Sequence, residues 1–528
     1  MKISKLILLI AIVCLGAFLR FYKLDQIPAG FYVDEAAIAV NANSILKTGL
    51  DEYGKAWPVF LRSYNAYSSP LYTYLTTFSI QVFGFTVFAA RFMSALAGTV
   101  SIIFVYLILK KLKISPLLGT LIFTLSPWGI FFSRGAFEAN LAFLLFTIAV
   151  YLLLTDKKYF FILAAAVLGV STYAYQAMRL VSILILPAFV LIKYKKKFIN
   201  REVVVAALVF TIIQLPQFWV IGSAAFANRA SGLFYNQAIM TQATKIPLPD
   251  FITLPLAFMR EFLANFVSYL SPRNLFLTPD SDPQRSLPEL SVFYSWLIVP
   301  FVFGLTKLNR QTAILVAVAV LPAALTRDPF SSLRSLSLLL PLIIIVASGL
   351  KNKTAFIYTL LTIPLSLLFL WRSYFVLFPQ ERARTWSYGY QRLAQIIKDN
   401  PGTHYLIDES RNNPSYVLLA FFMHVPPEEI QAASPNLINN YYSAGEFDNR
   451  YQIANFETGK VVWEEDIYEN QVLVGDSLAI SDTQAREHFL TKKFEIRDPT
   501  GEIVFVGYQT DPQAKCQTSP TPSEKCSY

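Results

Sequence analysis

Long apolar runs, separated by short polar stretches, fill the first 371 residues of the chain. The runs begin near residues 3, 70, 91, 115, 139, 159, 180, 202, 291, 311, 335 and 354, and most contain 16–20 residues. A helix needs about 20 apolar residues to cross a bilayer, and only helices and closed barrels satisfy their backbone hydrogen bonds in lipid. The pattern therefore predicts a polytopic α-helical membrane protein.

Basic clusters between the runs indicate how many of the runs cross. With the N-terminus in the cytoplasm and residues 70–86 not crossing, every strong cluster falls on the inner side, as the positive-inside rule requires. Counting 70–86 as a span would place all the later clusters outside. The inner clusters are Lys2 and Lys5; Lys110, Lys111 and Lys113; Lys157 and Lys158; Lys193 and Lys195–Lys197; Lys307 and Arg310; and Lys351 and Lys353.

Residues 70–86 have the composition of an interfacial helix. The run is short, opens with proline and carries threonine, serine and glutamine among aromatic residues. We therefore predict eleven spans in a plasma-membrane protein. Loops 20–90, 133–138, 175–179, 222–290 and 327–334 then lie on the outer face, with the C-terminal region.

The composition changes sharply at Arg372, after which polar helical and strand patterns alternate. Helices are predicted at 390–399, 415–423 and 482–490, and strands at 404–408, 472–480 and 502–508. We therefore predict a transmembrane domain over 1–371 and a small extracytoplasmic α/β domain over 372–510. The tail, 511–528, is rich in proline, serine and threonine and is predicted to be disordered.

Composition narrows the possible partners. Of the 528 residues, 54% are hydrophobic and 15% are charged, whereas soluble chains carry about 25% charged residues. The net charge of +10 comes from lysines between apolar runs and does not indicate nucleic acid. His404, His424 and His488 all follow the last run, so no histidine is available for a metal site in the membrane part. Cys516 and Cys526 allow a disulfide in the tail that the sequence does not assign.

Two adjacent carboxylates, Asp34 and Glu35, follow the first apolar run, and small and apolar residues at helical spacing come after them. A carboxylate at this place could simply cap the helix that begins there. It could also serve as the base of a reaction at the outer membrane face. We predict that Asp34 and Glu35 are both catalytic, with Asp34 as the general base.

Charged and aromatic residues in the other outer loops favour the second interpretation. Each arginine could snorkel to lipid phosphates, but several on one face with two carboxylate clusters indicate a shared anionic substrate. A lipid-phosphate sugar fits, because guanidinium groups stabilise a phosphate leaving group and a carboxylate accepts the proton of the attacking hydroxyl. The predicted substrate-binding residues are Arg134, Glu138, Tyr175, Arg179, Arg285 and Arg334.

These motifs resemble the GT-C superfamily of glycosyltransferases. Within it, residues 15–390 are most similar to the bacterial branch related to dolichyl-phosphate-mannose–protein mannosyltransferases and aminoarabinose transferases. The resemblance rests on the acidic pair; on Ser69-Pro70-Leu71-Tyr72, Phe83-Gly84-Phe85 and Ala89-Ala90-Arg91; on Ser126-Pro127, Ser133-Arg134 and Glu138; and on Asn265-Phe266, Ser271-Pro272, Phe276-Leu277, Asp280 and Arg285.

The resemblance implies an inverting transferase that uses a polyprenyl-phosphate sugar donor and a protein, lipid or polysaccharide acceptor. Asp34 matches the catalytic aspartate of the family, and Glu138 matches a second-loop acid that binds metal in some relatives. Ser68 and Ser69 stand where several relatives carry a charged residue and a second proline. Because the membrane part also lacks histidine, we predict a reaction without a metal or other cofactor.

Two further hypotheses stay open at the level of sequence. A transporter or flippase for a lipid-linked sugar would also collect charges, but it should place some of them deep within the spans. The middles of the predicted spans are nearly free of ionisable residues, which favours chemistry at one face. A non-catalytic scaffold for envelope assembly would leave Asp34 dispensable.

Overall fold

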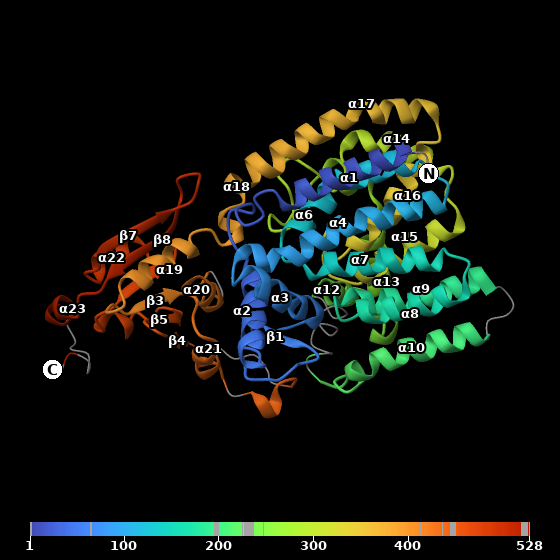
Figure 1. The fold of residues 1–528 in the computed structure, drawn as a ribbon. Coiled ribbons are helices and arrows are strands. Elements are labelled where there is room, and N and C mark those ends of the chain that lie inside the picture. The colour runs from blue at the N-terminus through green and yellow to red at the C-terminus, as the bar shows by residue number, and fades with distance from the viewer. Residues whose placement is uncertain are drawn as a thin grey trace.

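The computed structural model describes residues 3–63, 66–194, 200–223, 225, 237–245, 248–411, 414–435, 437–443, 450–518 and 526. A helical part fills one end of the molecule and a β-sheet the other, with helix α2 between them (Figure 1). The predicted basic residues Lys195–Lys197 lie outside the described residues.

Helices make up nearly all of the first part of the chain. They are α1 (Ile3–Phe21), α2 (Val33–Thr48), α3 (Pro70–Phe83), α4 (Val87–Lys111), α5 (Pro116–Thr124), α6 (Pro127–Arg134), α7 (Glu138–Leu153), α8 (Lys158–Ser171), α9 (Ala177–Tyr194), α10 (Arg201–Phe218), α12 (Gln237–Ala243), α13 (Asp250–Leu270), α14 (Ile298–Leu305), α15 (Arg310–Ala324), α16 (Leu339–Gly349), α17 (Lys353–Leu370) and α18 (Phe378–Glu381). A short hairpin, β1 (Leu61–Ser63) and β2 (Ala66–Ser68), follows α2.

The described part of the chain contains five helices that are long and apolar enough to cross a membrane. They are α1, α4, α10, α13 and the continuous stretch from α17 to α18; a sixth arises if α5 and α6, which meet at 51°, form one span. This is the pattern of a polytopic membrane protein. Several other predicted spans fold as helices of 10–17 residues, so the count of eleven remains a prediction.

Two boundaries differ from the sequence prediction. The predicted outer loop 222–290 contains α13, a helix of 21 residues whose length and hydropathy suit a membrane span. Asp250, Pro255, Arg260 and Glu261 interrupt its apolar pattern and hide it from a search for uncharged runs. At Arg372 the chain does not leave the helix, because α17 passes through a π-helical turn and α18 to residue 381.

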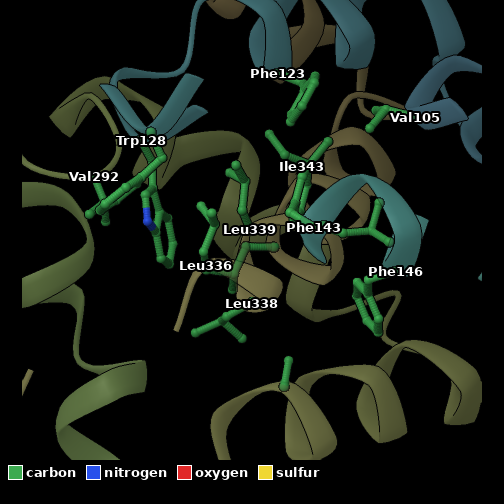
Figure 2. Packing of buried hydrophobic residues seen from close by; sticks show 14 of the residues in the cluster. Val105, Phe123, Trp128, Phe143, Phe146, Val292, Leu336, Leu338, Leu339 and Ile343 are labelled. Carbon is green, nitrogen blue, oxygen red and sulfur yellow. The ribbon is translucent and has the colours of Figure 1, made fainter. Parts of the chain in front are cut away.

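The helical part is held together by one large apolar cluster. Figure 2 shows Trp128 of α6, Phe143 of α7 and Ile343 of α16 within it, beside Leu336 and Leu339. The indole N–H of Trp128 donates to the backbone oxygen of Ser332 at 2.8 Å. Residues far apart in sequence thus fix α6 against the loop near residue 330.

The C-terminal part is built on a mixed sheet. Within the described residues the strand order is β4-β5-β3-β6-β8-β7; β3 is parallel to β5 and β6, and the other pairs are antiparallel. The strands are β3 (Tyr405–Asp408), β4 (Tyr451–Ile453), β5 (Phe456–Gly459), β6 (Val472–Gly475), β7 (Thr491–Arg497) and β8 (Ile503–Gln509). The helices are α19 (Tyr390–Asp399), α20 (Tyr416–Met423), α21 (Pro427–Ala433), α22 (Asp482–Glu487) and α23 (Pro512–Thr518).

Elements predicted in this part are confirmed where the apolar pattern is strong. The helix predicted at 390–399 is α19, and β3 and β8 lie within one residue of their predicted ranges. The prediction of a wholly disordered tail is wrong, because residues 512–518 form α23 and Cys516 is bonded to Cys526. Residues 519–525 and 527–528 lie outside the description.

The C-terminal part is bonded to the segment that carries the acidic pair. Apolar residues of α2, α19 and α20 share one buried cluster. Tyr416 of α20 donates to Glu52 Oε2 at 2.8 Å, and the Tyr441 hydroxyl donates to Asp51. Gln431 of α21 donates to Ser44 Oγ at 3.0 Å. These contacts fix the sheet relative to α2.

Candidate active site

Helix α2 begins at the acidic pair. Ala36, Ala37 and Ala39 follow it and are buried in the apolar cluster that α2 shares with α20, and alanine is the strongest helix former. Asp34 and Glu35 lie in the first turn, where carboxylates interact favourably with the helix dipole. Gly49 ends the helix in the left-handed conformation, at φ 75°. The sequence therefore places both carboxylates at a fixed helix start.

Glu35 is buried and its carboxylate is saturated by hydrogen bonds. Oε1 accepts from Arg91 Nε at 2.9 Å and from the backbone N–H of Ala136 at 2.7 Å. Oε2 accepts from Arg91 Nη2 at 2.8 Å and from the backbone N–H of Tyr32 at 3.0 Å. In this geometry Glu35 positions the start of α2, a role that differs from the catalytic one predicted from the sequence.

Asp34 differs from Glu35, because its side chain is exposed at the same helix terminus. The backbone of Asp34 is held by the bonds of its neighbour Glu35. An exposed carboxylate on a rigid helix start can approach a substrate hydroxyl without rearrangement of the fold. Of the two acids, Asp34 is the one that can act as a base.

Three buried arginines form what we call the arginine cage. Two of them hold the loop between α1 and α2, and the third, Arg20, donates to Ser133 Oγ at 3.1 Å. Arg20, Arg91 and Arg134 are each 0% exposed. Arg91 donates to the carbonyl oxygens of Leu24, Pro28 and Gly30, and Arg134 donates to those of Leu19, Tyr22 and Ile27, at 2.6–3.2 Å. The donors of Arg134 are therefore directed at backbone, which differs from the predicted contact with a donor phosphate.

Glu138 lies near the same buried pair. It is half-buried at the start of α7. Burial raises the pKa of the Tyr72 hydroxyl, and the charges of Glu35 and Glu138 raise it further. One carboxylate oxygen of Glu138, Oε1, is itself buried.

Tyr175 and Arg179 occupy a separate place beside the hairpin. Both are half-buried, and the Arg179 guanidinium lies 4.7 Å from the centre of the Phe60 ring. Gln176 between them donates to the carbonyl oxygen of Tyr67 at 3.1 Å. The third predicted loop therefore packs against the end of the first.

The remaining predicted arginines belong to a charged group that we call the acid–arginine cluster. Arg285 lies 3.2–3.6 Å from carboxylate oxygens of three aspartates, and Arg334 donates to one of them, Asp328, at 2.8 Å. The Arg285 side chain is 16% exposed and that of Arg334 is 33% exposed. The cluster comprises Asp280, Asp282, Arg285, Asp328 and Arg334.

Tyr32 connects the start of α2 to this cluster. Its hydroxyl donates to Gln284 Oε1 at 2.9 Å. Burial raises the pKa of Tyr32, the charges of Asp34 and Asp282 raise it further, and Gln284 and Arg285 lower it. The hydrogen bond to Gln284 thus joins the start of α2 to the loop that carries Asp282 and Arg285.

A cleft of about 230 Å³ opens beside Tyr32, between the start of α2 and the C-terminal part. Tyr32, Val33 and Gln284 form one side. The C-terminal part supplies the rest of the lining: Arg384, Thr385, Ser387, Tyr388, Tyr390, Arg411, Pro414, Leu418, Val504 and Phe505. Two parts of the chain that are distant in sequence thus build one cavity.

No group of three or more histidine, cysteine, aspartate or glutamate side chains within the described ranges is placed to hold a metal ion. In the acid–arginine cluster the carboxylates bind Arg285 and Arg334 instead. Asp280 Oδ2 also accepts hydrogen bonds from the backbone N–H and the hydroxyl of Ser332, both at 2.8 Å.

The decisive comparison concerns the region that follows the first hairpin strand. Residues 67–219 match the family model described as dolichyl-phosphate-mannose-protein mannosyltransferase. The match confirms the resemblance predicted from the sequence, and it runs from β2 to the end of α10. It includes Arg91 of the cage together with Arg134, Glu138, Tyr175 and Arg179.

Solved structures with a similar course of the chain come from two kinds of protein. ArnT from Cupriavidus metallidurans is 12% identical, with 96% of this chain and 98% of that chain covered and a TM-score of 0.45. The Archaeoglobus fulgidus oligosaccharyltransferase is 10% identical, with 99% and 76% covered and a TM-score of 0.47. No curated protein matches this chain.

Sequence reasoning missed several residues around the site. Arg91 lies inside a predicted span, where its partner in another loop could not be seen. Tyr32 and Gln284 carry no charge, so the charge pattern does not mark them as site residues. Asp282 and Asp328 lie close to predicted arginines, and the spacing Asp280, Asp282 and Arg285 was the signal that could have indicated the cluster.

Proposed function

We propose that the protein is a membrane glycosyltransferase that moves a sugar from a polyprenyl-phosphate donor to an acceptor hydroxyl. The observation that carries the proposal is the contrast within the acidic pair. Glu35 is buried and saturated, while Asp34 is exposed on a fixed helix start, next in sequence to Tyr32 and Val33, which line the cleft. The family match over residues 67–219 supports the same reaction class.

In the proposed reaction Asp34 accepts the proton of the acceptor hydroxyl. The acceptor oxygen then attacks the anomeric carbon from the side opposite the phosphate. The new bond from oxygen to carbon forms as the bond from carbon to the phosphate oxygen breaks, and the polyprenyl phosphate leaves with the electron pair. The configuration at the anomeric carbon is inverted. General-base catalysis of this kind contributes about 10²–10⁴-fold to the rate.

The leaving phosphate is proposed to bind at the acid–arginine cluster. Arg334 is the better placed of its two arginines, because one carboxylate contacts it and a third of its side chain is exposed. Arg285 is shared among three carboxylates and contributes mainly by holding the cluster next to Tyr32. Tyr175 and Arg179 are proposed to contact the substrate from the side of the hairpin, and Glu138 to orient α3.

We place the site at the outer face of the cell membrane. Disulfides persist in oxidising compartments, and Cys516 is bonded to Cys526 in the C-terminal part, which is itself bonded to the loop after α2. After reduction, a membrane-impermeant maleimide should label both cysteines in intact cells. Labelling only after cell lysis would place the C-terminal part inside.

The test of the function is transfer of radiolabelled sugar from polyprenyl-phosphate donors in membranes. Asp34→Asn should lower transfer at least 100-fold while the protein stays folded. Asp25→Asn is the matched control, because Asp25 is an exposed aspartate of the same loop, and its transfer should equal that of the wild type. Transfer should also survive EDTA, since we propose a reaction without metal.

Unchanged transfer in Asp34→Asn would remove Asp34 as the base. Absence of transfer from a panel of donor sugars would contradict the enzyme itself. Donor flipping by the purified protein in liposomes would then favour the transporter, and a protein that neither transfers nor flips would be a scaffold.

A further inference from the structure

The wall of the cleft that faces Tyr32 carries two arginines from the C-terminal part. Arg384 and Arg411 both line the cavity, and their side chains are 44% and 47% exposed. They belong to different segments, one before α19 and the other after β3. Neither was predicted as a site residue, and the mechanism above does not use them.

A single buried carboxylate holds both guanidinium groups. Asp476 Oδ2 accepts from Arg384 Nη2 at 3.3 Å and from Arg411 Nε at 3.1 Å, and the Asp476 side chain is 3% exposed. Its other oxygen accepts from the backbone N–H groups of Leu478 and Ala479 at 2.9 and 2.8 Å. Each arginine thus commits one edge to Asp476, and half-exposed guanidinium surface remains in the cavity.

The groups around Asp476 keep its carboxylate ionised. Burial raises the pKa of Asp476. The backbone hydrogen bonds from Ala479 and Leu478 and the contact with Arg411 lower it by more, so the pKa lies below its usual value. Two positive charges therefore share one negative charge at the cavity wall. Glu502, 3.8 Å from Arg384 Nη1, is 71% exposed and does not belong to the lining.

The rest of the cavity suits a sugar-sized group. Pockets for drug-sized ligands measure about 300–1,000 Å³, so a cavity of about 230 Å³ takes a smaller group. Tyr32, Tyr388, Tyr390 and Phe505 supply aromatic side chains to the lining, and Gln284 supplies an amide. Aromatic faces with a few polar groups are a common lining for such a ligand.

We propose that this cleft binds the acceptor, and that the acceptor carries an anionic group, phosphate or carboxylate, which Arg384 and Arg411 bind while its hydroxyl faces Asp34. The inference rests on the proposed function and names the substrate class of that site. Guanidinium groups bind both anions through paired hydrogen bonds.

The test is binding of small probes to the full chain in nanodiscs, followed by ligand-detected NMR and calorimetry. Glucuronate and glucose 6-phosphate supply the two anions, and glucose is the neutral probe. At least one anionic probe should bind roughly ten-fold or more tightly than glucose. Arg384→Gln and Arg411→Gln should each lower its affinity roughly ten-fold, and Arg411→Lys should restore part of the loss because the charge is kept.

Arg392→Gln is the matched control, because Arg392 is an exposed arginine of α19, the helix that also supplies Tyr390. Its probe affinity should equal that of the wild type. Equal binding of glucose and both anions, or unchanged affinity in both cleft variants, would overturn the inference. A preference for one anion over the other would distinguish a phosphate from a carboxylate acceptor.

The two proposals can fail separately. If Asp34→Asn abolishes transfer and no anionic probe binds, the transferase stands and the anionic acceptor is wrong. If an anionic probe binds through Arg384 and Arg411 but no donor sugar is transferred, the cleft is a binding site and the transferase is wrong.

Discussion

The arginine cage and the acid–arginine cluster use the same residue types in opposite ways. The cage contains three fully buried arginines and one carboxylate, Glu35, and most of its other hydrogen bonds go to backbone carbonyl oxygens. The cluster contains two partly exposed arginines and three carboxylates, and side chains make most of its contacts. Of the cage only Arg134 was predicted from its charge, whereas both arginines of the cluster were.

The difference teaches that burial and partner type separate a structural arginine from one that can bind substrate. A fully buried guanidinium group that donates to carbonyl oxygens is closed to a substrate and fixes the course of a loop. A guanidinium group paired with a half-exposed carboxylate can exchange that partner for a phosphate at little cost. The cage therefore holds Asp34 in place, and the cluster is available for chemistry.

The largest effect should come from breaking the cage at Arg91. Arg91→Met leaves Glu35 buried without its charged partner, and loss of one partner of a buried pair costs about 3–5 kcal/mol. Chemical denaturation of the purified protein in detergent should show this loss. Arg327→Met, at an arginine that is 76% exposed in the loop of the cluster, is the control and should change stability by about 0.5 kcal/mol or less. Equal stability of the two variants would remove the distinction between cage and cluster.

The sequence predicted the position of the acidic pair and the match to a known family. It did not predict that Glu35 is buried and hydrogen-bonded while Asp34 is exposed. Both precede small residues at helical spacing, so the local pattern treats them alike. Arg91 binds Glu35 and thereby makes it differ from Asp34, but Arg91 lies 56 residues away from Glu35, at the start of an apolar run. Contacts at such a separation have no local signature.

The fold could be predicted where one side of an element is apolar and its ends are marked. The strongly amphipathic α19 and the apolar β3 and β8 met that condition. Helix α13 did not, because Arg260 and Glu261 lie near its middle. Strand β7 did not either, because most of its residues are exposed or half-buried and its pairing with β8 supplies the order.

Glu52 gives an intermediate case, a fully buried carboxylate with neutral partners. It accepts from Asn41 and Tyr416, and burial raises its pKa from 4.5 to about 7. The folded state therefore binds the proton of Glu52 more tightly than the unfolded state does. The contribution of protonated Glu52 to the free energy of unfolding is complete below pH 4.5 and is lost as the pH rises to about 7. We expect the contacts between α2 and the C-terminal part to weaken over this interval.

Glu52→Gln should remove that dependence, since the amide keeps a neutral side chain of the same shape. At pH 8 the variant should be more stable than the wild type by up to about 3 kcal/mol, and at pH 4 the two should be similar. Unfolding measured from pH 4 to pH 8 checks this. The exposed Glu464→Gln should follow the wild-type profile, and a Glu52→Gln profile parallel to wild type would show that Glu52 does not titrate there.

A smaller effect is expected from the loop that the cage holds. A Cβ atom on Gly30 would lie 1.8 Å from the backbone oxygen of Trp386, so Gly30→Ala must push apart the loop before α2 and the segment that lines the cleft. Overpacking of this kind costs about 1–3 kcal/mol. Gly402→Ala, where a Cβ meets nothing within 4 Å, is the control. Thermal unfolding should separate the two variants, and equal melting temperatures would show that this contact yields freely.

The smallest change in stability should come from the cluster, at Arg334. Its bond to Asp328 is partly exposed, and pairs of that kind contribute about 1 kcal/mol or less, so Arg334→Ala should unfold nearly as the wild type does. Its donor affinity should nevertheless fall several-fold, because the phosphate loses a charged hydrogen bond. Titration of the detergent-solubilised protein with polyprenyl phosphate measures this affinity directly. A large loss of stability with unchanged affinity would assign Arg334 to the structural class of Arg91, and the phosphate would then have to bind elsewhere on the outer face.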